Sequence, residues 1–291
     1  MAEQKAGLLH IRCWDVGRGT AVAIQGPAGG WLLFDLGQKA LGKGKAFSPV
    51  RHLYREYGVR EVEHIILSHP HQDHIADLPA ALDLLKAKHW ACPQHLLRRE
   101  VMKGVGQRHR ALFQQYWNVQ KEAALWDGWR QWQGMELALF SPQPKGRGGQ
   151  NHQNPNNHSL VLLLRWQGFQ MVLCGDNEAA SWRWLMAQPA FAEALPATTV
   201  LLAPHHGRRS SFYAAAVKAM SPQVTIIQDG ARQKTSVTHA YTRKSSGRHL
   251  LAASHIQHRK VLSSRRDGRI YLQAGTDPLT GDFYWRVEGN I

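Results

Sequence analysis

Cysteine is scarce in this chain of 291 residues, which contains only Cys13, Cys92 and Cys174. The three are widely spaced, odd in number and each set among apolar residues. A disulfide framework needs paired cysteines and an oxidising compartment. We therefore expect three reduced core residues, and the sequence excludes the small disulfide-stabilised secreted domains as a class.

Long hydrophobic runs are also missing. No window approaches the roughly 18 uninterrupted apolar residues of a membrane-spanning helix. The first residues, Met1 to Gly7, lack the pattern of a signal peptide. The expectation is a soluble, cytoplasmic protein with no membrane span.

Two common catalytic motifs are absent as well. The chain has no Gly-x-Ser-x-Gly elbow, which presents a nucleophilic serine, and no Walker loop, which cradles nucleotide phosphates. Any hydrolytic chemistry therefore needs a nucleophile that is not a side chain of these types.

Acidic residues are few, since 21 Asp and Glu against 36 Lys and Arg leave a formal net charge of +15. The basic residues cluster, for example at Arg98-Arg99, Arg108-His109-Arg110 and Arg265-Arg266. Such a field concentrates polyanions and speeds their capture. The alternative interpretation is a solubilising surface on a protein that has no nucleic-acid partner.

One short stretch, residues 68–74, holds four candidate metal ligands: His69, His71, Asp73 and His74. An apolar run at 62–67 predicts a strand before it, and 75–82 reads as a helix start. The ligands thus lie on a strand-to-helix loop. Imidazole and carboxylate suit zinc, manganese or iron, and the spacing suggests two adjacent metals. The competing interpretation is a polar surface loop in a chain with 17 His.

Further polar residues stand where other predicted strands end. A hairpin of two apolar runs, 160–166 and 170–174, is preceded by Asn157-His158-Ser159 and ends at Gly175-Asp176. A strand at 200–203 ends in Pro204-His205-His206-Gly207-Arg208-Arg209-Ser210. Asp35 ends a third strand, where it could orient a ligand loop or act as a plain turn-former.

These elements together resemble the metallo-β-lactamase superfamily, whose signature is the His-x-His-x-Asp-His loop. The closer resemblance is to the hydrolase domain of ComEC-type competence proteins, which take up DNA. It rests on the turn at 16–21, Asp35-Leu36-Gly37, Asn156 to Leu162, Leu173 to Asp176 and the His-His-Gly at 205–207. It covers about residues 8–272, interrupted at 86–134. The fold it implies is α/β, a four-layer αββα sandwich.

The resemblance also implies a site. It places His69, His71 and His158 on one metal, Asp73, His74 and His206 on a second, and Asp176 between them, with Zn or Mn as the two ions. It implies catalytic roles for Asp73, Asp176 and His205, a phosphate-binding role for Arg208, Arg209, Ser210 and His239, and a structural role near the site for Asp35. His239 could equally be an ordinary surface histidine.

Three positions depart from the ComEC-type pattern. Thr20 replaces an Asp, Arg208 replaces a Ser, and Thr238-His239-Ala240 lacks the usual Pro. The change at Arg208 adds a guanidinium suited to bidentate phosphate contact.

We expect one domain over residues 1–275, with an extra strand pair or tail at 276–291. The segment 86–134 is the least family-like part and holds five of the 11 Trp residues. Its apolar spacing predicts mostly helix, covering the end of the sandwich. Its aromatic and basic residues could stack bases, or the Trp residues could form core or the contact with a protein partner or a second copy.

The leading functional hypothesis is a dinuclear metal-dependent phosphodiesterase that hydrolyses nucleic acid, with DNA as the expected substrate and partner. Two alternatives stay open. One is a hydrolase of small phosphoesters such as phosphorylcholine-type groups, and the other is a non-catalytic DNA-binding accessory of uptake.

Overall fold

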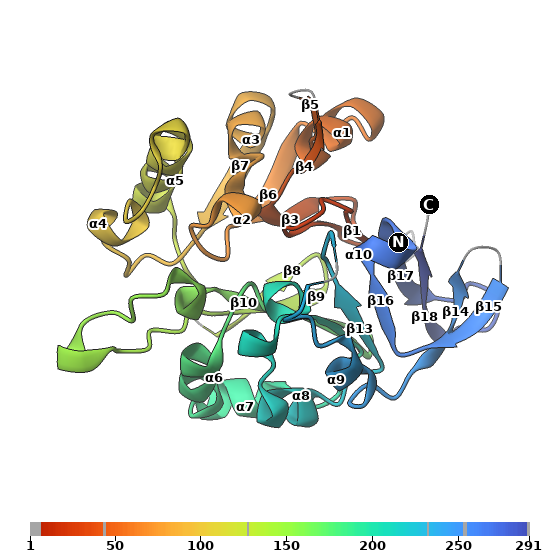
Figure 1. The fold of residues 1–291 in the computed structure, drawn as a ribbon. Coiled ribbons are helices and arrows are strands. Elements are labelled where there is room, and N and C mark those ends of the chain that lie inside the picture. Colours follow the sequence, from red (N-terminus) through yellow and green to blue (C-terminus); the bar gives the residue numbers. More distant parts are fainter. Residues whose placement is uncertain (1–6, 43–44, 127, 232, 253–254, 290–291) are drawn as a thin grey trace.

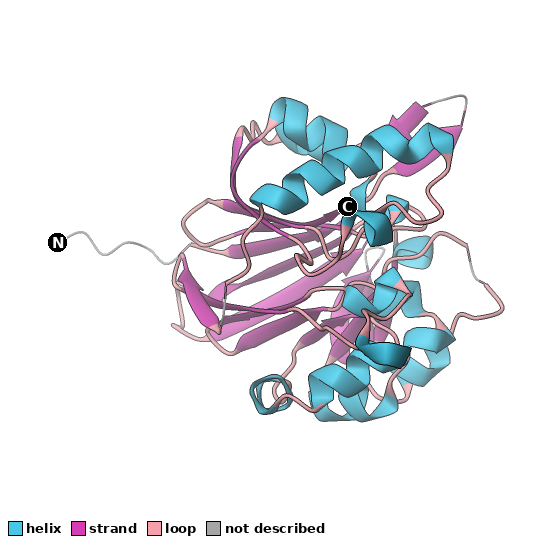
Figure 2. Ribbon diagram, turned by 90° about the vertical axis from the view of Figure 1, so that its left-hand side faces the viewer, coloured by secondary structure: helices cyan, strands magenta, loops and turns pink. Residues whose placement is uncertain are grey.

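Two β-sheets packed face to face organise the computed structural model, which describes residues 7–42, 45–126, 128–231, 233–252 and 255–289 (Figure 1). Helices cover the outer face of each sheet (Figure 2). The layers run helix, sheet, sheet, helix. This arrangement confirms the predicted αββα sandwich.

The first sheet has nine strands. A meander at its centre, β1 to β3, is antiparallel, whereas β3, β6 and β7 run parallel. In spatial order the strands are β15 (His255–Arg259), β14 (Arg248–Ala252), β18 (Phe283–Gly289), β17 (Ile270–Thr276), β1 (Leu9–Cys13), β2 (Ala21–Gln25), β3 (Trp31–Leu36), β6 (Glu61–Ile66) and β7 (Lys86–Ala91).

The second sheet has seven strands. The predicted hairpin is present as β10 and β11, and β11, β12, β13 and β16 follow in parallel. In spatial order the strands are β16 (Val261–Ser263), β13 (Val224–Ile227), β12 (Val200–Leu202), β11 (Phe169–Leu173), β10 (Val161–Trp166), β9 (Met135–Phe140) and β8 (Trp129–Trp132). A separate ribbon pairs β4 (Lys39–Gly42) with β5 (Lys45–Phe47).

Local sequence explains where the outer helices begin. The helix at 49–56, for example, starts with Pro49 after Ser48, whose hydroxyl accepts a hydrogen bond from the backbone N–H of Arg51. The helices are α1 (Pro49–Glu56), α2 (Gln72–Ile75), α3 (Leu78–Leu84), α4 (Arg98–Val101), α5 (Arg110–Glu122), α6 (Ala179–Met186), α7 (Pro189–Ala194), α8 (Ala214–Met220), α9 (Thr238–Thr242) and α10 (Ser264–Asp267). The 3-10 turns are η1 (Gln107–His109), η2 (Arg147–Gly149), η3 (Pro155–His158), η4 (Pro204–Gly207) and η5 (Arg209–Ser211).

The core has three parts, one between the sheets and one under each helical layer. Strand β10 shows why both faces of a sheet are apolar: Leu162 and Leu164 enter the layer between the sheets, while Val161 and Leu163 pack against the helices over the second sheet. Successive side chains alternate in this way because a strand has a period of two. A sheet buried on both faces therefore reads as a continuous apolar run.

The prediction of a mostly helical insert at 86–134 is only partly right. Its ends are strands β7 and β8, which extend the two sheets, and helix occurs only in the middle, at α4, η1 and α5. Trp126 and Trp132 lie in the core between the sheets, and Trp90 and Trp117 pack against the outer core. None of these four rings presents an exposed face on which a base could stack. The fifth, Trp129, is 38% exposed, but the guanidinium of Arg165 covers its ring.

The C-terminal segment at 276–291 contributes the strand β18, which pairs with β17 and β14 inside the first sheet. No helix within the described part of the chain has both the length and the apolar character needed to span a bilayer.

Candidate metal centre

Six of the seven predicted ligands converge at one edge of the sandwich. Strands β3, β6, β11 and β12 end there, and parallel strands place the residues that follow them at a common edge. Residues 68–74 follow β6, Asp176 follows β11, and His206 follows β12 within η4. Segments that lie more than 100 residues apart in sequence are thereby neighbours.

Six side chains form two groups whose ligand atoms lie within 4.8 Å of one another in each group: His69, His71 and Asp176 in the first, and Asp73, His74 and His206 in the second. Asp176 reaches both groups. Its Oδ1 lies 3.1 Å from His74 Nε2, and its Oδ2 lies 3.9 Å from His69 Nε2 and 3.7 Å from His206 Nε2.

The inner atoms of this cluster have no hydrogen-bond partner outside the cluster among the described residues, and the shortest contact within it joins His74 Nε2 and Asp176 Oδ1 at 3.1 Å. They are His69 Nε2, His74 Nε2, His206 Nε2 and Asp176 Oδ1, all in buried side chains. Burying polar atoms without partners is costly, by roughly 1–3 kcal/mol each. Two divalent cations, one in each group, would satisfy these atoms, and imidazole with carboxylate is a donor set that zinc accepts. The residues present therefore fit a metal pair.

The outer nitrogens of the same rings, in contrast, are engaged. His74 Nδ1 lies 2.7 Å from Asp35 Oδ2, His206 Nδ1 donates to the carbonyl of Gln228 at 2.9 Å, and His69 Nδ1 lies 3.0 Å from the hydroxyl of Ser68. These contacts orient each ring with Nε2 toward the centre. Such outer partners are what fixes the tautomer of a metal-binding histidine.

Burial and charge set the protonation of these groups. Burial lowers the pKa of His69 and of His71, which keeps both rings in the neutral form that binds metals. For Asp176, burial acts to raise the pKa, but the adjacent His74 and His206 outweigh it and hold the pKa well below its usual value. The same carboxylate and Asp35 overcome burial at His74 and raise its pKa in the metal-free site.

Two unusual backbone positions support the centre. His205 and His206 both have positive φ, 50° and 53°, in the turn after β12. Asp35 has φ 58° and uses its carboxylate to accept hydrogen bonds from the N–H and the hydroxyl of Ser68. Non-glycine residues held in this region are uncommon and concentrate at functional sites.

The turn at 17–20 braces Asp73. The N–H of Thr20 donates to the carbonyl of Asp73 at 3.2 Å, and a methyl group added at Gly19 would sit 2.6 Å from that oxygen. Glycine is required there because the backbones approach so closely. Thr20, which departs from the ComEC-type pattern, thus contributes through its backbone.

His205 belongs to neither group. Its Nε2 lies 3.7 Å from Asp176 Oδ2, while its Nδ1 faces Glu178 Oε1 at 3.3 Å and the hydroxyl of Ser211 at 3.1 Å. The structure therefore places His206, rather than His205, among the candidate ligands. Glu178 is a site residue that the sequence alone does not single out; its position two residues after Asp176 is the available signal.

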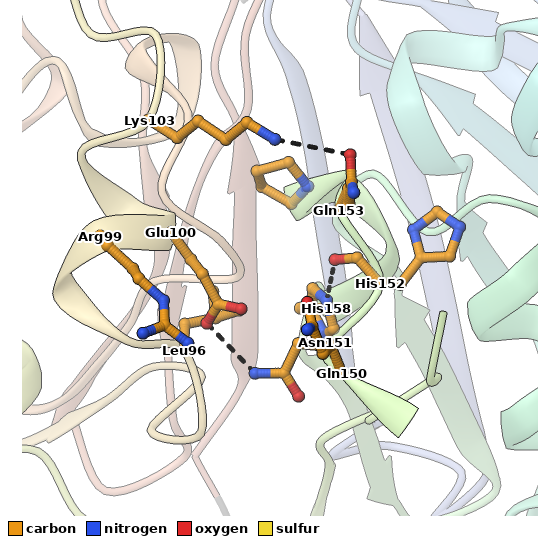
Figure 3. A pocket seen from close by; sticks show the side chains of 10 residues that line it. Leu96, Arg99, Glu100, Lys103, Gln150, Asn151, His152, Gln153 and His158 are labelled. Atoms are coloured by element: carbon orange, nitrogen blue, oxygen red, sulfur yellow. Dashed lines mark hydrogen bonds between the residues drawn. The ribbon is translucent and has the colours of Figure 1, made fainter. Parts of the chain in front are cut away.

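His158 is the predicted ligand that the structure does not bring to the centre. Its Nδ1 lies 2.9 Å from His95 Nε2, and its Nε2 lies 2.8 Å from the carbonyl of His152 (Figure 3). Both ring nitrogens are thus occupied, and the ring lines a neighbouring pocket. The first group accordingly holds two imidazoles and Asp176.

The predicted phosphate-binding residues are spread around the rim. Arg208 is buried and its Nη1 donates to the hydroxyl of Thr235 at 3.2 Å. Arg209 and Ser210 are exposed in η5, and the Ser210 hydroxyl lies 3.5 Å from His205 Nδ1. His239 lies on α9, and among the described residues nothing links its side chain to either ligand group.

Comparison with proteins of known sequence or structure finds distant similarity over much of the chain. The chain is 22% identical over 213 residues to ComE operon protein 3 of Bacillus subtilis, an alignment that covers 73% of this chain but only 26% of that protein, so the chain spans about a quarter of its relative. Among solved structures, the metallo-β-lactamase fold protein YhfI of Bacillus subtilis is 12% identical with a TM-score of 0.44, covering 78% of this chain and 88% of that one. An isothiocyanate hydrolase from Delia radicum gut bacteria is 13% identical with a TM-score of 0.44, covering 80% and 89%.

The model of one protein family, described as the metallo-beta-lactamase superfamily, matches most of the chain. It spans residues 14–227 and therefore includes Asp35, the loop at 68–74, Asp176 and His206. On this match the chain belongs to the metallo-beta-lactamase superfamily.

Proposed function

We propose that this protein is a phosphodiesterase that depends on two divalent cations, Zn or Mn, and cleaves nucleic acid, with DNA as its substrate. The observation that carries the proposal is the pair of ligand groups that lie on either side of Asp176, with buried polar atoms of His69, His74, His206 and Asp176 inside them. Family membership and these donors together support a metal-dependent hydrolase.

Two-metal sites suit phosphoryl chemistry. When bound, such a pair supplies Lewis acidity toward a phosphoryl oxygen and an activated water. The chain's own part is to hold that pair with Asp73, Asp176 and the imidazoles, and to position the substrate. No serine elbow or Walker loop is needed for this.

Three features favour a polyanionic substrate. The net charge of +15 draws a polyanion to the surface and raises its rate of capture. Arg208 presents a guanidinium beside the centre, where burial lowers its pKa and both Asp229 and Asp176 act on it through their charge. The ComEC-type resemblance adds DNA as the expected polymer.

Residues at the rim take the remaining roles in this proposal. His205 faces Asp176 across 3.7 Å and contacts the scissile phosphate, and Arg208 binds a phosphate oxygen. Arg209 and Ser210 follow in the same turn and extend that contact. The three buried, unpaired cysteines are compatible with a reducing cytoplasm.

The test is a salt series of DNA cleavage by the wild type and by Asp73→Ala, with metal content measured on both. We expect the wild type to cleave DNA with Mn or Zn, at a rate that falls as the salt concentration rises. Mutating a residue that only hydrogen-bonds to a metal ligand costs roughly 10- to 100-fold in activity or metal affinity, so Asp73→Ala, which removes a ligand, should reduce cleavage by at least that factor.

Other results would contradict the proposal. DNA left intact with Mn, Zn and Mg present would remove the nuclease assignment. Rapid, salt-insensitive turnover of a bis-aryl phosphate without polynucleotide binding would favour a small phosphoester. DNA binding with less than one metal per chain would indicate a non-catalytic module.

A further inference from the structure

A pocket of about 250 Å³ is lined by residues that Figure 3 draws, and its loop wall is hydrogen-bonded to residues of the candidate metal centre. One wall is the segment 96–103, which contains α4, and the other is the loop 150–158. Nothing in the proposed chemistry uses this pocket. Its volume is slightly below the roughly 300–1,000 Å³ of pockets that enclose whole small ligands, so it matches one part of a longer molecule.

The charge inside the pocket is unbalanced. Arg99 and Lys103 are exposed and lie on one wall; Lys103 Nζ reaches across toward Gln153 Oε1 at 3.5 Å, and Arg99 makes no hydrogen bond or ion pair with any described residue (Figure 3). The carboxylate on this wall, Glu100, already accepts hydrogen bonds at Oε2 from the N–H of Leu97 at 2.7 Å and from Asn151 Nδ2 at 3.2 Å. Two cations and one carboxylate therefore line the pocket, which leaves a net charge of +1, and neither cation forms an ion pair with Glu100 among the described residues.

The loop that forms the second wall is attached to the metal centre at several points. Asn154 Nδ2 and Asn156 Nδ2 donate to the two carboxylate oxygens of Glu178 at 3.0 and 3.3 Å, and Glu178 faces His205. Further along, the hydroxyl of Ser159 accepts a hydrogen bond from the N–H of Asp176 at 3.0 Å. A nucleic-acid strand bound across Asp176 therefore meets the pocket next, on the side of the loop 150–158.

The surfaces of the pocket are not only charged. Leu96 and Pro155 contribute apolar faces, and Gln150 and Asn151 contribute amide groups. Apolar faces beside amides can hold a sugar or a base without reading its sequence, while Arg and Lys take the phosphate.

We propose that this pocket binds a nucleotide next to the one whose phosphate is cleaved, with Arg99 and Lys103 holding its phosphate group. The pocket is then a substrate subsite that separates a polynucleotide from a small phosphodiester, because a bis-aryl phosphate is too short to reach it. This inference rests on the proposed function for the position of the scissile phosphate.

The experiment compares the wild type, the double variant R99Q/K103Q and the control R55Q/K218Q. The control removes two exposed cations from α1 and α8, which do not line the pocket. Each full-length protein is assayed for hydrolysis of a short oligothymidylate and of bis(p-nitrophenyl) phosphate. Binding is measured separately, by the fluorescence anisotropy of a dye-labelled copy of the same oligothymidylate, across a series of salt concentrations. EDTA is present in this assay so that the oligonucleotide is not cleaved.

For R99Q/K103Q we expect KM for the oligonucleotide to rise by about tenfold more than KM for the small ester. Log affinity decreases as log salt concentration increases, and this dependence should become shallower by about 0.7 for each phosphate that the two cations no longer neutralise. For R55Q/K218Q both quantities should stay at the wild-type values.

The two proposals fail in different ways. If the wild type cleaves the oligonucleotide but R99Q/K103Q behaves like the control, the pocket assignment is wrong and the nuclease assignment stands. If R99Q/K103Q binds the oligonucleotide more weakly and with a smaller salt slope while the wild type cleaves no oligonucleotide, the pocket binds the polymer and the nuclease assignment is wrong.

Discussion

Asp35 and Asp176 hold the imidazole of His74 from opposite sides. Asp35 Oδ2 lies 2.7 Å from Nδ1, and Asp176 Oδ1 lies 3.1 Å from Nε2. Asp35 also accepts hydrogen bonds from the N–H and the hydroxyl of Ser68, which begins the ligand loop. One carboxylate outside the ligand set thus fixes both the ring and the loop.

Asp35→Asn should weaken metal binding while leaving the fold intact. Asparagine tolerates the positive φ of 58° at this position, so the backbone need not move. Removing the negative charge makes His74 a poorer ligand, and we expect metal affinity to fall by roughly 10- to 100-fold. Isothermal titration of the metal-free protein with zinc measures the change.

Asp77→Asn is the matched control, since Asp77 is also a buried carboxylate but accepts its hydrogen bonds from Ser48, Gln38 and the N–H of Val50. It should affect stability more than zinc affinity. Wild-type zinc affinity in Asp35→Asn would show that Asp35 only shapes the loop.

Gly19→Ala should disturb the site from the side of Asp73. The added methyl group would meet the carbonyl oxygen of Asp73 at 2.6 Å, so one of the two backbones must shift. Overpacking of this kind costs about 1–3 kcal/mol in the free energy of unfolding. Urea denaturation and zinc content together should show a less stable protein that retains less metal.

Gly106→Ala serves as the comparison, because a methyl group there meets nothing within 4 Å. It should leave stability within about 0.5 kcal/mol of the wild type, as most surface substitutions do. Equal stabilities of the two variants would mean that the 17–20 turn moves freely away from Asp73.

The sequence is a good guide to the centre because the ligands are local signals at strand ends. The His-x-His-x-Asp-His loop, Asp176 and His206 each follow a short apolar run, and such runs predict strands that end at a common edge. The sequence favours His206 over His205 only through resemblance, since both lie in the same turn and His206 is the one that directly precedes Gly207. The choice depends on two left-handed backbone positions that aim the rings in different directions.

Two failures have a physical cause in tertiary structure. The resemblance implies that His158 binds the first metal, but its ring nitrogens lie against His95 Nε2 and the carbonyl of His152 instead. The segment at 86–91 falls within the predicted helical insert although it is strand β7, because four of its six residues are Lys or Ala, which are uncommon in strands, and none is β-branched. Pairing with β6 decides its conformation, and tertiary context routinely overrides weak local preference.

Metal removal should lower thermal stability. The Nε2 atoms of His69 and His206 have no hydrogen-bond partner among the described residues, and His74 Nε2 and Asp176 Oδ1 contact each other inside the cluster, so metal binding should favour the folded state. At a free zinc concentration 100 times the dissociation constant, the stabilisation is about 2.7 kcal/mol. For a chain of 291 residues that corresponds to a shift in Tm of roughly 4–5 °C.

Differential scanning calorimetry with EDTA and with added zinc measures this shift. Asp176→Asn should reduce it strongly, because one carboxylate serves both groups. A Tm that is the same with EDTA and with zinc would contradict the metal centre itself.

His64 should make the protein less stable in mild acid, independently of the metal centre. It is buried in β6, stacks on His89 at 5.2 Å between ring centroids and lies against Trp126 at 5.3 Å. Burial lowers its pKa from 6.5 to about 4. Between these values the unfolded chain binds a proton that the folded chain excludes, so the stability that the neutral ring provides is full above pH 6.5 and is lost as pH falls toward 4.

The expected loss of stability from this one group is about 2 kcal/mol between pH 7.5 and pH 4.5. His64→Phe keeps an aromatic ring in the same layer and cannot take up a proton. Between pH 7.5 and pH 4.5 the free energy of unfolding of this variant should therefore decrease by about 2 kcal/mol less than that of the wild type. Urea denaturation of both proteins in EDTA, followed by Trp fluorescence, gives the difference, and contributions from the metal ligands cancel because both proteins are metal-free.

His258→Gln, at an exposed position on β15, should follow the wild-type pH profile. If His64→Phe follows that profile too, the ring of His64 reaches solvent on protonation, and the layer between β6 and the two Trp residues opens more easily than its packing indicates.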